Sequence, residues 1–438
     1  MRKTLFLALL ALAASCLSLS GQIKRTAVPI GDAVNKALAK GSLTAEGERP
    51  FHIRVEISEP ENPQSPYQGT LEVWWISPNQ WRREATAKGG MRQTIIVADG
   101  KKSEKDEGDY FPLWLRSFLT AILDPIPNAN VWNSSGLMIE QITMPNGDKS
   151  DACARAQSKI GTGDRATDAF SNVCFDGEGR LKFYGSPAYS MEFHDYRGFG
   201  KKQIARTLSD DPEPGTKLVG KVVMLEDESK VKDSSSLFAP VQGDDNHFQT
   251  VPVASGQLER LSAGNQPIVW PTVHSGNLRG RLAVYISVDS NGRVREAWPL
   301  NSDNSGLDDS VRDQVRHWTL PPAIDKTGNR VQIEGGLGFA FETKIEDPLP
   351  ELSDAEVRAL ATKIIEPVWP AGSVTPGQIV EAQVSVNEQG QLTGTSYAKV
   401  PSALFGAVNS ALRQWTFRPL IRDGKPQYFH GTVKFTAQ

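Results

Sequence analysis

Two stretches in the last third of the chain carry the same pattern of apolar and polar positions. In each stretch, apolar residues recur three or four positions apart, which is the spacing of one face of an α-helix. The two stripes are Leu307, Val311, Val315 and Trp318, and Leu404, Val408, Leu412 and Trp415. Each stripe predicts an amphipathic helix that ends at a tryptophan.

Alternating segments flank both predicted helices. Residues 282–288 and 380–386 precede the helices and alternate as half-buried strands do. Residues 333–339 and 429–435 form a closing strand after each helix. Internal repeats are diagnostic of architecture. We therefore interpret this region as a tandem duplication of a β-hairpin–helix–β module.

Short motifs recur at matching places in the two copies. They are Trp270-Pro271, the turn sequence VDSNGRV at 288–294, Trp318 with Pro322 and Gly335 with Phe339 in the first copy, and Trp369-Pro370, Trp415 with Pro419 and Gly431 with Phe435 in the second. The pattern resembles the C-terminal domain of TonB, the periplasmic end of the Gram-negative energy transducer. The second copy departs from it by carrying Asn387 in place of the turn aspartate, and both copies begin with Trp where Tyr is commoner.

The TonB resemblance implies two small domains, at residues 264–345 and 351–438. Their cores are expected to contain Trp318, Trp415, Phe339 and Phe435. In that family the module captures a peptide from an outer-membrane receptor. The physical route is strand addition, in which an extended peptide pairs with an open sheet edge.

The N-terminal half has a different pattern, with many short alternating segments. A helical pattern at 30–41 is followed by alternating segments at 51–57 and 71–75, and turns rich in Pro, Asn and Gly separate these from further strands. An amphipathic helix is predicted at 115–122. Successive strands joined by tight turns describe an antiparallel meander.

Three motifs of this half follow one another in a recognisable order. They are GTLEVWW at 69–75, PNQWRR at 78–83 and IIVADGK at 95–101. The order resembles that of the LolA/LolB type of lipoprotein carrier, an unclosed antiparallel barrel with helices across its mouth. The resemblance covers residues 27–225 and implies a concave face that holds lipid acyl chains. The candidates for that face are Val73, Trp75, Trp114 and Phe118. The alternative is that these side chains only fill a core, as large apolar residues on strands usually do.

The predicted fold class is α+β. An unclosed antiparallel β-barrel with helices at 27–225 is followed by a connection at 226–263, which is expected to be ordered only around 237–240. Two small TonB-like modules complete the chain. Between them, Ser353 and Glu356 predict a capping box at the start of a further helix.

The first residues predict export from the cytoplasm. Arg2 and Lys3 precede an uncharged run, and small residues before Gly21 are typical of a signal-peptide cleavage site, so residues 1–20 are interpreted as a signal peptide. Cys16 offers a rival interpretation as a lipid-anchored residue, and an uncleaved anchor is a third. In an exported chain the pair Cys153 and Cys174 favours a disulfide over two buried free thiols.

Charge and motif content point away from several functions. The net charge of −3 over 438 residues provides no standing attraction to nucleic acid. No H-E-x-x-H, G-x-S-x-G or P-loop motif occurs, and the six histidines are scattered singly. We expect neither a catalytic site, a metal site nor a cofactor.

The leading functional hypothesis is a non-enzymatic periplasmic cell-envelope protein. It would bind extended peptides or protein partners through the two TonB-like modules. One alternative is an energy-transducer role in transmembrane transport, and another is periplasmic carriage of lipid or lipoprotein by the N-terminal half. Homodimerisation by strand exchange is left open.

Overall fold

The computed structural model describes residues 24–44, 49–144, 148–213, 215–228, 236–243, 248–345, 350–370, 372–397, 399–401, 404–422 and 424–437. Within it the chain divides into two compact units. The first comprises Met1–Trp270 and Arg279–Phe341, and the second comprises Pro271–Leu278 and Glu342–Gln438. The predicted signal peptide and Cys16 lie outside the described residues.

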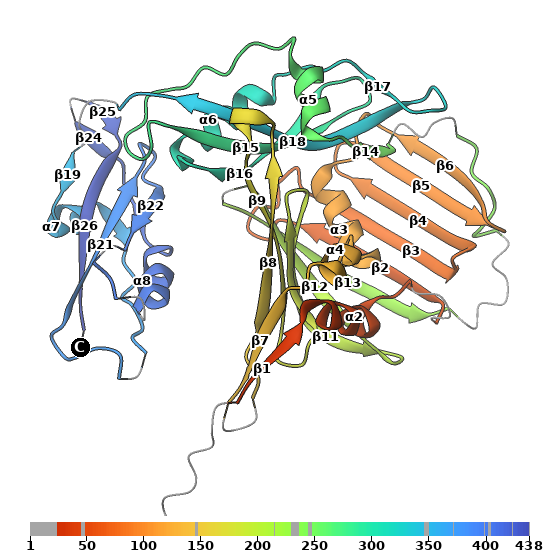
Figure 1. The fold of residues 1–438 in the computed structure, drawn as a ribbon, viewed down its shortest axis with the longest axis horizontal. Coiled ribbons are helices and arrows are strands. Elements are labelled where there is room, and N and C mark those ends of the chain that lie inside the picture. Colours follow the sequence, from red (N-terminus) through yellow and green to blue (C-terminus); the bar gives the residue numbers. More distant parts are fainter. Residues whose placement is uncertain are drawn as a thin grey trace, which may run out of the picture. The chain divides into compact units, whose positions relative to one another are not determined.

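An eleven-stranded sheet forms most of the first unit (Figure 1). In spatial order its strands are β6 (Lys101–Glu107), β5 (Met91–Ala98), β4 (Gln80–Ala87), β3 (Gly69–Ser77), β2 (Phe51–Ser58), β13 (Thr216–Asp227), β12 (Lys202–Glu213), β11 (Tyr189–Phe199), β10 (Leu181–Ser186), β9 (Thr167–Phe175) and β8 (Ala152–Ile160). Every neighbouring pair is antiparallel. Strands β6 and β8 are the two edges, so the described strands do not close into a barrel.

Three helices lie against this sheet (Figure 1). They are α2 (Ile30–Gly41), α3 (Leu113–Leu123) and α4 (Ala129–Ser134), and the short strands β1 (Lys24–Pro29) and β7 (Met138–Thr143) pair beside them. The alternation in β2 buries Phe51, Ile53, Val55 and Ile57 against the helices, as the sequence pattern predicts. Phe118 of α3 is fully buried in the same core.

A disulfide joins the two strands at one edge of the sheet. Cys153 of β8 and Cys174 of β9 are direct cross-strand neighbours, and their sulfur atoms are bonded. The predicted Cys153–Cys174 bond is therefore present. It closes the hairpin whose connecting segment contains the short helix η1 (Gly163–Arg165).

The first unit also contains a second, smaller sheet with its own helices, which we call the first module (residues 250–270 and 279–341). Its elements are β14 (Thr250–Pro252), α5 (Ser255–Ser262), β15 (Arg279–Val288), β16 (Val294–Ser302), η2 (Ser305–Leu307), α6 (Asp308–Val315), β17 (Ala323–Ile324) and β18 (Arg330–Glu342). The sheet order is β14-β18-β15-β16, with β14 parallel to β18.

This arrangement differs from the predicted connection at 226–263. Strand β14 and helix α5 lie in that stretch and belong to the first module. The sequence hides them because β14 is only three residues long and α5 contributes one fully buried side chain, Leu258.

A buried polar cluster ties the first module to the large sheet. The Glu296 carboxylate of β16 accepts hydrogen bonds from the Tyr110 hydroxyl at 2.5 Å and from the Leu113 backbone N–H at 2.6 Å. Arg116 of α3 forms an ion pair with Glu334 of β18 at 2.9 Å. These contacts make one compact unit of two parts that the sequence pattern predicts to fold separately.

The second module (residues 350–437) repeats the plan of the first within the second unit. Its elements are β19 (Glu351–Leu352), α7 (Asp354–Leu360), β20 (Ala361–Lys363), β21 (Ile379–Val386), β22 (Leu392–Ser396), α8 (Phe405–Leu412), β23 (Thr416–Phe417), β24 (Leu420–Arg422), β25 (Lys425–Gln427) and β26 (Phe429–Thr436). Its main sheet has the order β19-β26-β21-β22, and β19 is parallel to β26 as β14 is to β18. The predicted capping box of Ser353 and Glu356 is present at α7.

The four predicted core aromatics of the modules are not equally buried. Trp415 and Phe435 are 3% and 0% exposed. Trp318 and Phe339, at the matching places of the first module, are only half-buried. The expectation of an enclosed core therefore holds for the second pair and is wrong for the first, because nothing among the described residues covers the first pair fully.

The difference in burial predicts unequal costs of truncation. Trp415→Ala removes a fully buried ring and should lower the free energy of unfolding of the second unit by about 3–5 kcal/mol. Trp318→Ala removes a half-buried ring and should cost less than half as much. Denaturant unfolding of the two full-length variants, followed by circular dichroism, measures both costs. Equal losses would contradict the structure.

The Glu296 contacts predict a local effect at the start of helix α3. Glu296→Ala leaves the Tyr110 hydroxyl and the Leu113 N–H without their acceptor, which should cost about 2–4 kcal/mol. Glu296→Gln keeps an acceptor oxygen and should lose less. Hydrogen exchange at the first turn of α3 should speed up in the Ala variant, and unchanged exchange there would show that the carboxylate does not cap the helix.

Candidate functional site

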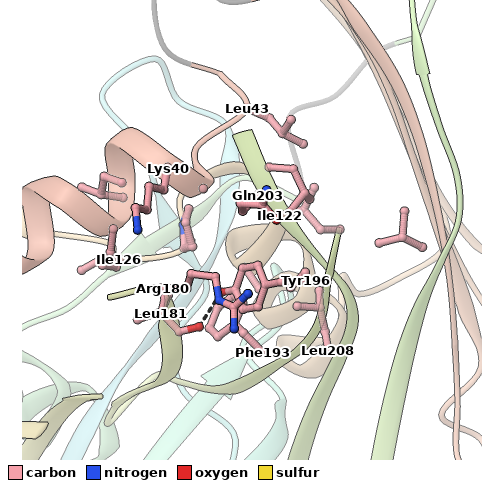
Figure 2. A pocket seen from close by; sticks show the side chains of 18 of the residues that line it. Lys40, Leu43, Ile122, Ile126, Arg180, Leu181, Phe193, Tyr196, Gln203 and Leu208 are labelled. Carbon is pink, nitrogen blue, oxygen red and sulfur yellow. Dashed lines mark hydrogen bonds between the residues drawn. The ribbon is translucent and has the colours of Figure 1, made fainter. Parts of the chain in front are cut away.

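A small apolar cavity lies between helix α2, the end of α3 and the middle of the large sheet (Figure 2). Its apolar lining comprises Ala37, Leu38, Leu43, Ile53, Ala121, Ile122, Pro125, Ile126, Leu181, Phe193, Ile204, Ala205, Leu208 and Val222. The cavity volume is about 40 Å³, which is room for roughly three water molecules. Three of the lining residues are alanines, and their short side chains leave this space open.

Polar groups lie along one side of the cavity. Lys40 at the end of α2 donates a hydrogen bond from Nζ to the backbone oxygen of Glu178 at 2.6 Å. The Arg180 guanidinium pairs with Asp176 at 2.7 Å and lies 4.9 Å from the centre of the Tyr196 ring. Figure 2 shows Arg180 and Tyr196 side by side below α2. An apolar interior with the Lys40 ammonium at its margin suits an amphiphile with an apolar tail and an anionic head.

The Tyr196 hydroxyl faces the protein interior at this margin. It donates a hydrogen bond to the backbone oxygen of Leu181. Burial raises the pKa of Tyr196, and the nearby Asp176 carboxylate raises it further. The phenol therefore stays neutral and fixes one wall of the cavity.

The structure places the predicted ligand-face residues elsewhere. Val73, Trp114 and Phe118 are 1%, 4% and 0% exposed and belong to the core between α3 and the sheet, and Trp75 is half-buried against that core. None of the four lines the cavity. The core-packing alternative describes them, because α3 lies directly on this part of the sheet.

Sequence reasoning missed the cavity because its lining comes from seven separate segments of chain. Only the helical stripe with Ala37 and Leu38 carried a readable signal, since it predicts a helix with one apolar face. Only the tertiary structure places that face against β10–β12. Small residues at Ala121 and Ala205 give no sign in the sequence that they adjoin open space.

A wider groove opens on another side of α3. Its walls come from α3, α4, β8, the turn between β10 and β11, and the first module, and its volume is about 790 Å³. The Arg116–Glu334 pair is part of its lining. Burial lowers the pKa of Arg116, but Glu334, Tyr110, Glu296 and Tyr285 together outweigh this and leave the pKa above its ordinary value. The two charges thus satisfy each other, and their contact joins α3 to β18 at the wall of the groove.

A buried carboxyl lies on β12, two residues beyond the cavity residue Leu208. Asp210 is 4% exposed, and its Oδ2 atom has no hydrogen-bond partner within the described residues. Burial raises the pKa of Asp210 to about 7, although a hydrogen bond from the Asp211 backbone opposes the shift. The nearby hydroxyl of Tyr189 is also buried without a partner. Ionisation of Asp210 therefore opposes folding.

No metal-binding or membrane-spanning feature appears in the described part of the chain. Among those residues, no group of three or more His, Cys, Asp or Glu side chains could hold a metal ion. None of the helices that the structure describes is both long enough and apolar enough to cross a membrane.

Two solved structures are similar to about half of the chain. One is a domain from Vibrio parahaemolyticus described as an outer membrane lipoprotein-sorting protein. It is 10% identical, with a TM-score of 0.23, and the similarity covers 47% of this chain and 94% of that one. The other is a LolA superfamily protein from Nitrosomonas europaea, 9% identical, with a TM-score of 0.23 and coverage of 48% and 98%.

The remaining comparisons give no match. No protein-family model matches the chain. No curated protein matches it either. The TonB resemblance of the modules stays a prediction. Since a TM-score of 0.23 does not establish a common fold, the function has to be inferred from the residues of the chain itself.

The raised pKa of Asp210 predicts a pH dependence of stability. The unfolded chain releases this proton near pH 4 and the folded chain near pH 7, so the free energy of unfolding falls as the pH rises between those values. Above pH 7 the loss is complete and amounts to at most about 4 kcal/mol. Asp210→Asn lacks this loss and should be more stable than the wild type at pH 8 but not at pH 4. Urea unfolding across this range measures the difference, and parallel pH profiles would rule out a buried, ionisable Asp210.

Proposed function

We propose that the N-terminal half carries an apolar chain, such as the acyl chain of a lipid or lipoprotein, in the cavity beneath helix α2. The supporting observation is the cavity itself, which is apolar within and has Lys40 and Arg180 at its margin. The proposal includes the periplasm as the place of action, because the sequence predicts export. It replaces strand addition at the modules as the leading hypothesis.

The small cavity volume means that a ligand has to widen the site. About 40 Å³ does not hold an acyl chain. Helix α2 is anchored by the buried side chains of Ile30, Val34 and Ala37, so only its last residues, 38–41, have no fully buried side chain. Its last turn is held by two exposed hydrogen bonds: Lys40 Nζ donates to the backbone oxygen of Glu178, and Lys202 Nζ donates to the backbone oxygen of Ala39. Such bonds contribute about 1 kcal/mol each, so movement of the last turn is the least costly way to open the cavity.

Charge at the margin favours an anionic head group. Lys40 satisfies only a backbone oxygen there, so its charge has no carboxylate partner in that contact. Arg180 already pairs with Asp176 and Glu178. We therefore assign the head-group contact to Lys40 and a supporting role to Arg180, which keeps the Tyr196 wall in place.

Uptake of a fluorescent fatty acid by lipid-stripped protein tests the proposal. The wild type should show saturable uptake. Ala37→Phe places a ring in the cavity and should lower affinity at least tenfold, because the ring occupies the space that the chain needs. Ala39→Phe is the matched control, since Ala39 is exposed on the same helix and should leave uptake unchanged.

The outcomes separate the cavity from other apolar surfaces. Thermal unfolding of both variants should show that each is folded, because overpacking alone costs about 1–3 kcal/mol. Uptake that persists in Ala37→Phe would place the ligand outside the cavity. A wild type that takes up no fatty acid at all would overturn the carrier function.

A further inference from the structure

The two modules share an aromatic pair that is covered in one and open in the other. The rings of Trp318 and Phe339 are 5.8 Å apart, and those of Trp415 and Phe435 are 5.9 Å apart. The second pair is buried, whereas the first is half-buried. The two aromatic pairs therefore differ in what covers them.

An extended segment of the second module lies over Trp415. Strand β20 pairs with β23, and just beyond it the backbone oxygen of Ile365 accepts a hydrogen bond from Trp415 Nε1 at 2.9 Å. The Arg358 guanidinium lies 5.3 Å from the Trp415 ring and 5.8 Å from the Phe435 ring. Arg358 also pairs with Glu366 at 3.1 Å, so the segment is held by both its backbone and its acidic residue.

The first module has a glutamate where the second has this arginine. Leu258 of α5 packs on Gly335 as Val357 of α7 packs on Gly431, which aligns the next residue, Glu259, with Arg358. Glu259 turns away from the aromatic pair and bonds Arg165 at 2.8 Å on the β8–β9 connection. Among the described residues, no arginine or lysine lies over the Trp318 or Phe339 ring.

The backbone cover is missing as well. In place of a strand like β20, the Asn265 side chain accepts the hydrogen bond from the Thr319 backbone N–H at 3.0 Å. Within the described residues, Trp318 Nε1 donates no hydrogen bond. A groove of about 720 Å³ results, with Trp270, Trp318 and Phe339 along it.

We propose that this groove binds an extended peptide segment of a partner protein. The segment places an apolar side chain against the aromatic rings, its backbone oxygen accepts from Trp318 Nε1, and an acidic residue follows. The matching segment of the second module has this chemistry, with Ile365 followed by Glu366. Arg260 supplies charge complementarity, because it is exposed at the groove and has no side-chain partner among the described residues.

This site is distinct from both the acyl-chain cavity and the sheet edges. It uses the face of an aromatic pair, whereas strand addition uses unpaired backbone groups of an edge strand. It does not rest on the carrier function, because no residue lines both the groove and the cavity.

The test uses a fluorescein-labelled peptide with the sequence ATKIIE, taken from residues 361–366, and the full chain. Fluorescence anisotropy should show saturable binding. Trp318→Ala should weaken it at least tenfold, and Trp318→Phe about three- to tenfold, because the ring remains and only the N–H is lost. Arg260→Ala should weaken binding of this peptide but not of its counterpart ending in Gln.

Controls keep the result interpretable. Ile324→Ala changes a side chain that is 65% exposed on β17, outside the groove, and should leave binding unchanged. Circular dichroism should show that Trp318→Phe and Arg260→Ala are folded. Absence of saturable binding, or binding that both of these folded variants retain in full, would overturn the proposal.

Discussion

The Glu296 carboxylate is the contact on which the first unit depends. A helix leaves its first N–H groups without partners, and α3 has no capping side chain of its own. Glu296, which lies 183 positions from Leu113, supplies the acceptor from another sheet. Burial raises the pKa of this carboxyl, while hydrogen bonds from Tyr110 and the helix backbone oppose the shift. An acceptor this far along the chain makes the helix and the first module parts of one structure.

Duplication followed by divergence explains the contrast between the modules. Both retain the parallel edge strand, the hairpin, the helix and the aromatic pair. One helix position holds Glu259 in the first module and Arg358 in the second. Arg358 lies over the aromatic rings, whereas Glu259 bonds Arg165 instead. The first module gains a contact with the connection between β8 and β9 and loses the cover of its tryptophan. The second keeps the cover, and its core is closed.

Both proposed sites are spaces that the neighbouring elements leave unfilled. Beneath α2, alanines leave a small apolar volume. In the first module, the absence of a strand like β20 leaves a groove beside the aromatic pair. Packing in protein interiors is otherwise close to that of crystals. Openings of this kind in an otherwise packed unit are therefore the first places to look for a ligand.

Local patterns in the sequence determined the elements and the duplication. The helix at 30–41, the alternation of β2, the capping box at Ser353 and the Cys153–Cys174 pair all rest on neighbours in sequence or on pairing chemistry. They could be predicted because periodicity, caps and cysteine count act over short distances. Strand β14 escaped prediction because it is only three residues long, and helix α5 because it has a single fully buried side chain, Leu258.

Only the tertiary structure decided which surfaces are open. Val73 and Phe118 look alike as wall or core until α3 is placed on them. Trp318 and Trp415 close the same helical pattern in their two copies, yet one is half-buried and the other is enclosed. The physical reason is that burial depends on residues far along the chain, such as Arg165 for the first tryptophan and Ile365 for the second. No local pattern encodes those distances.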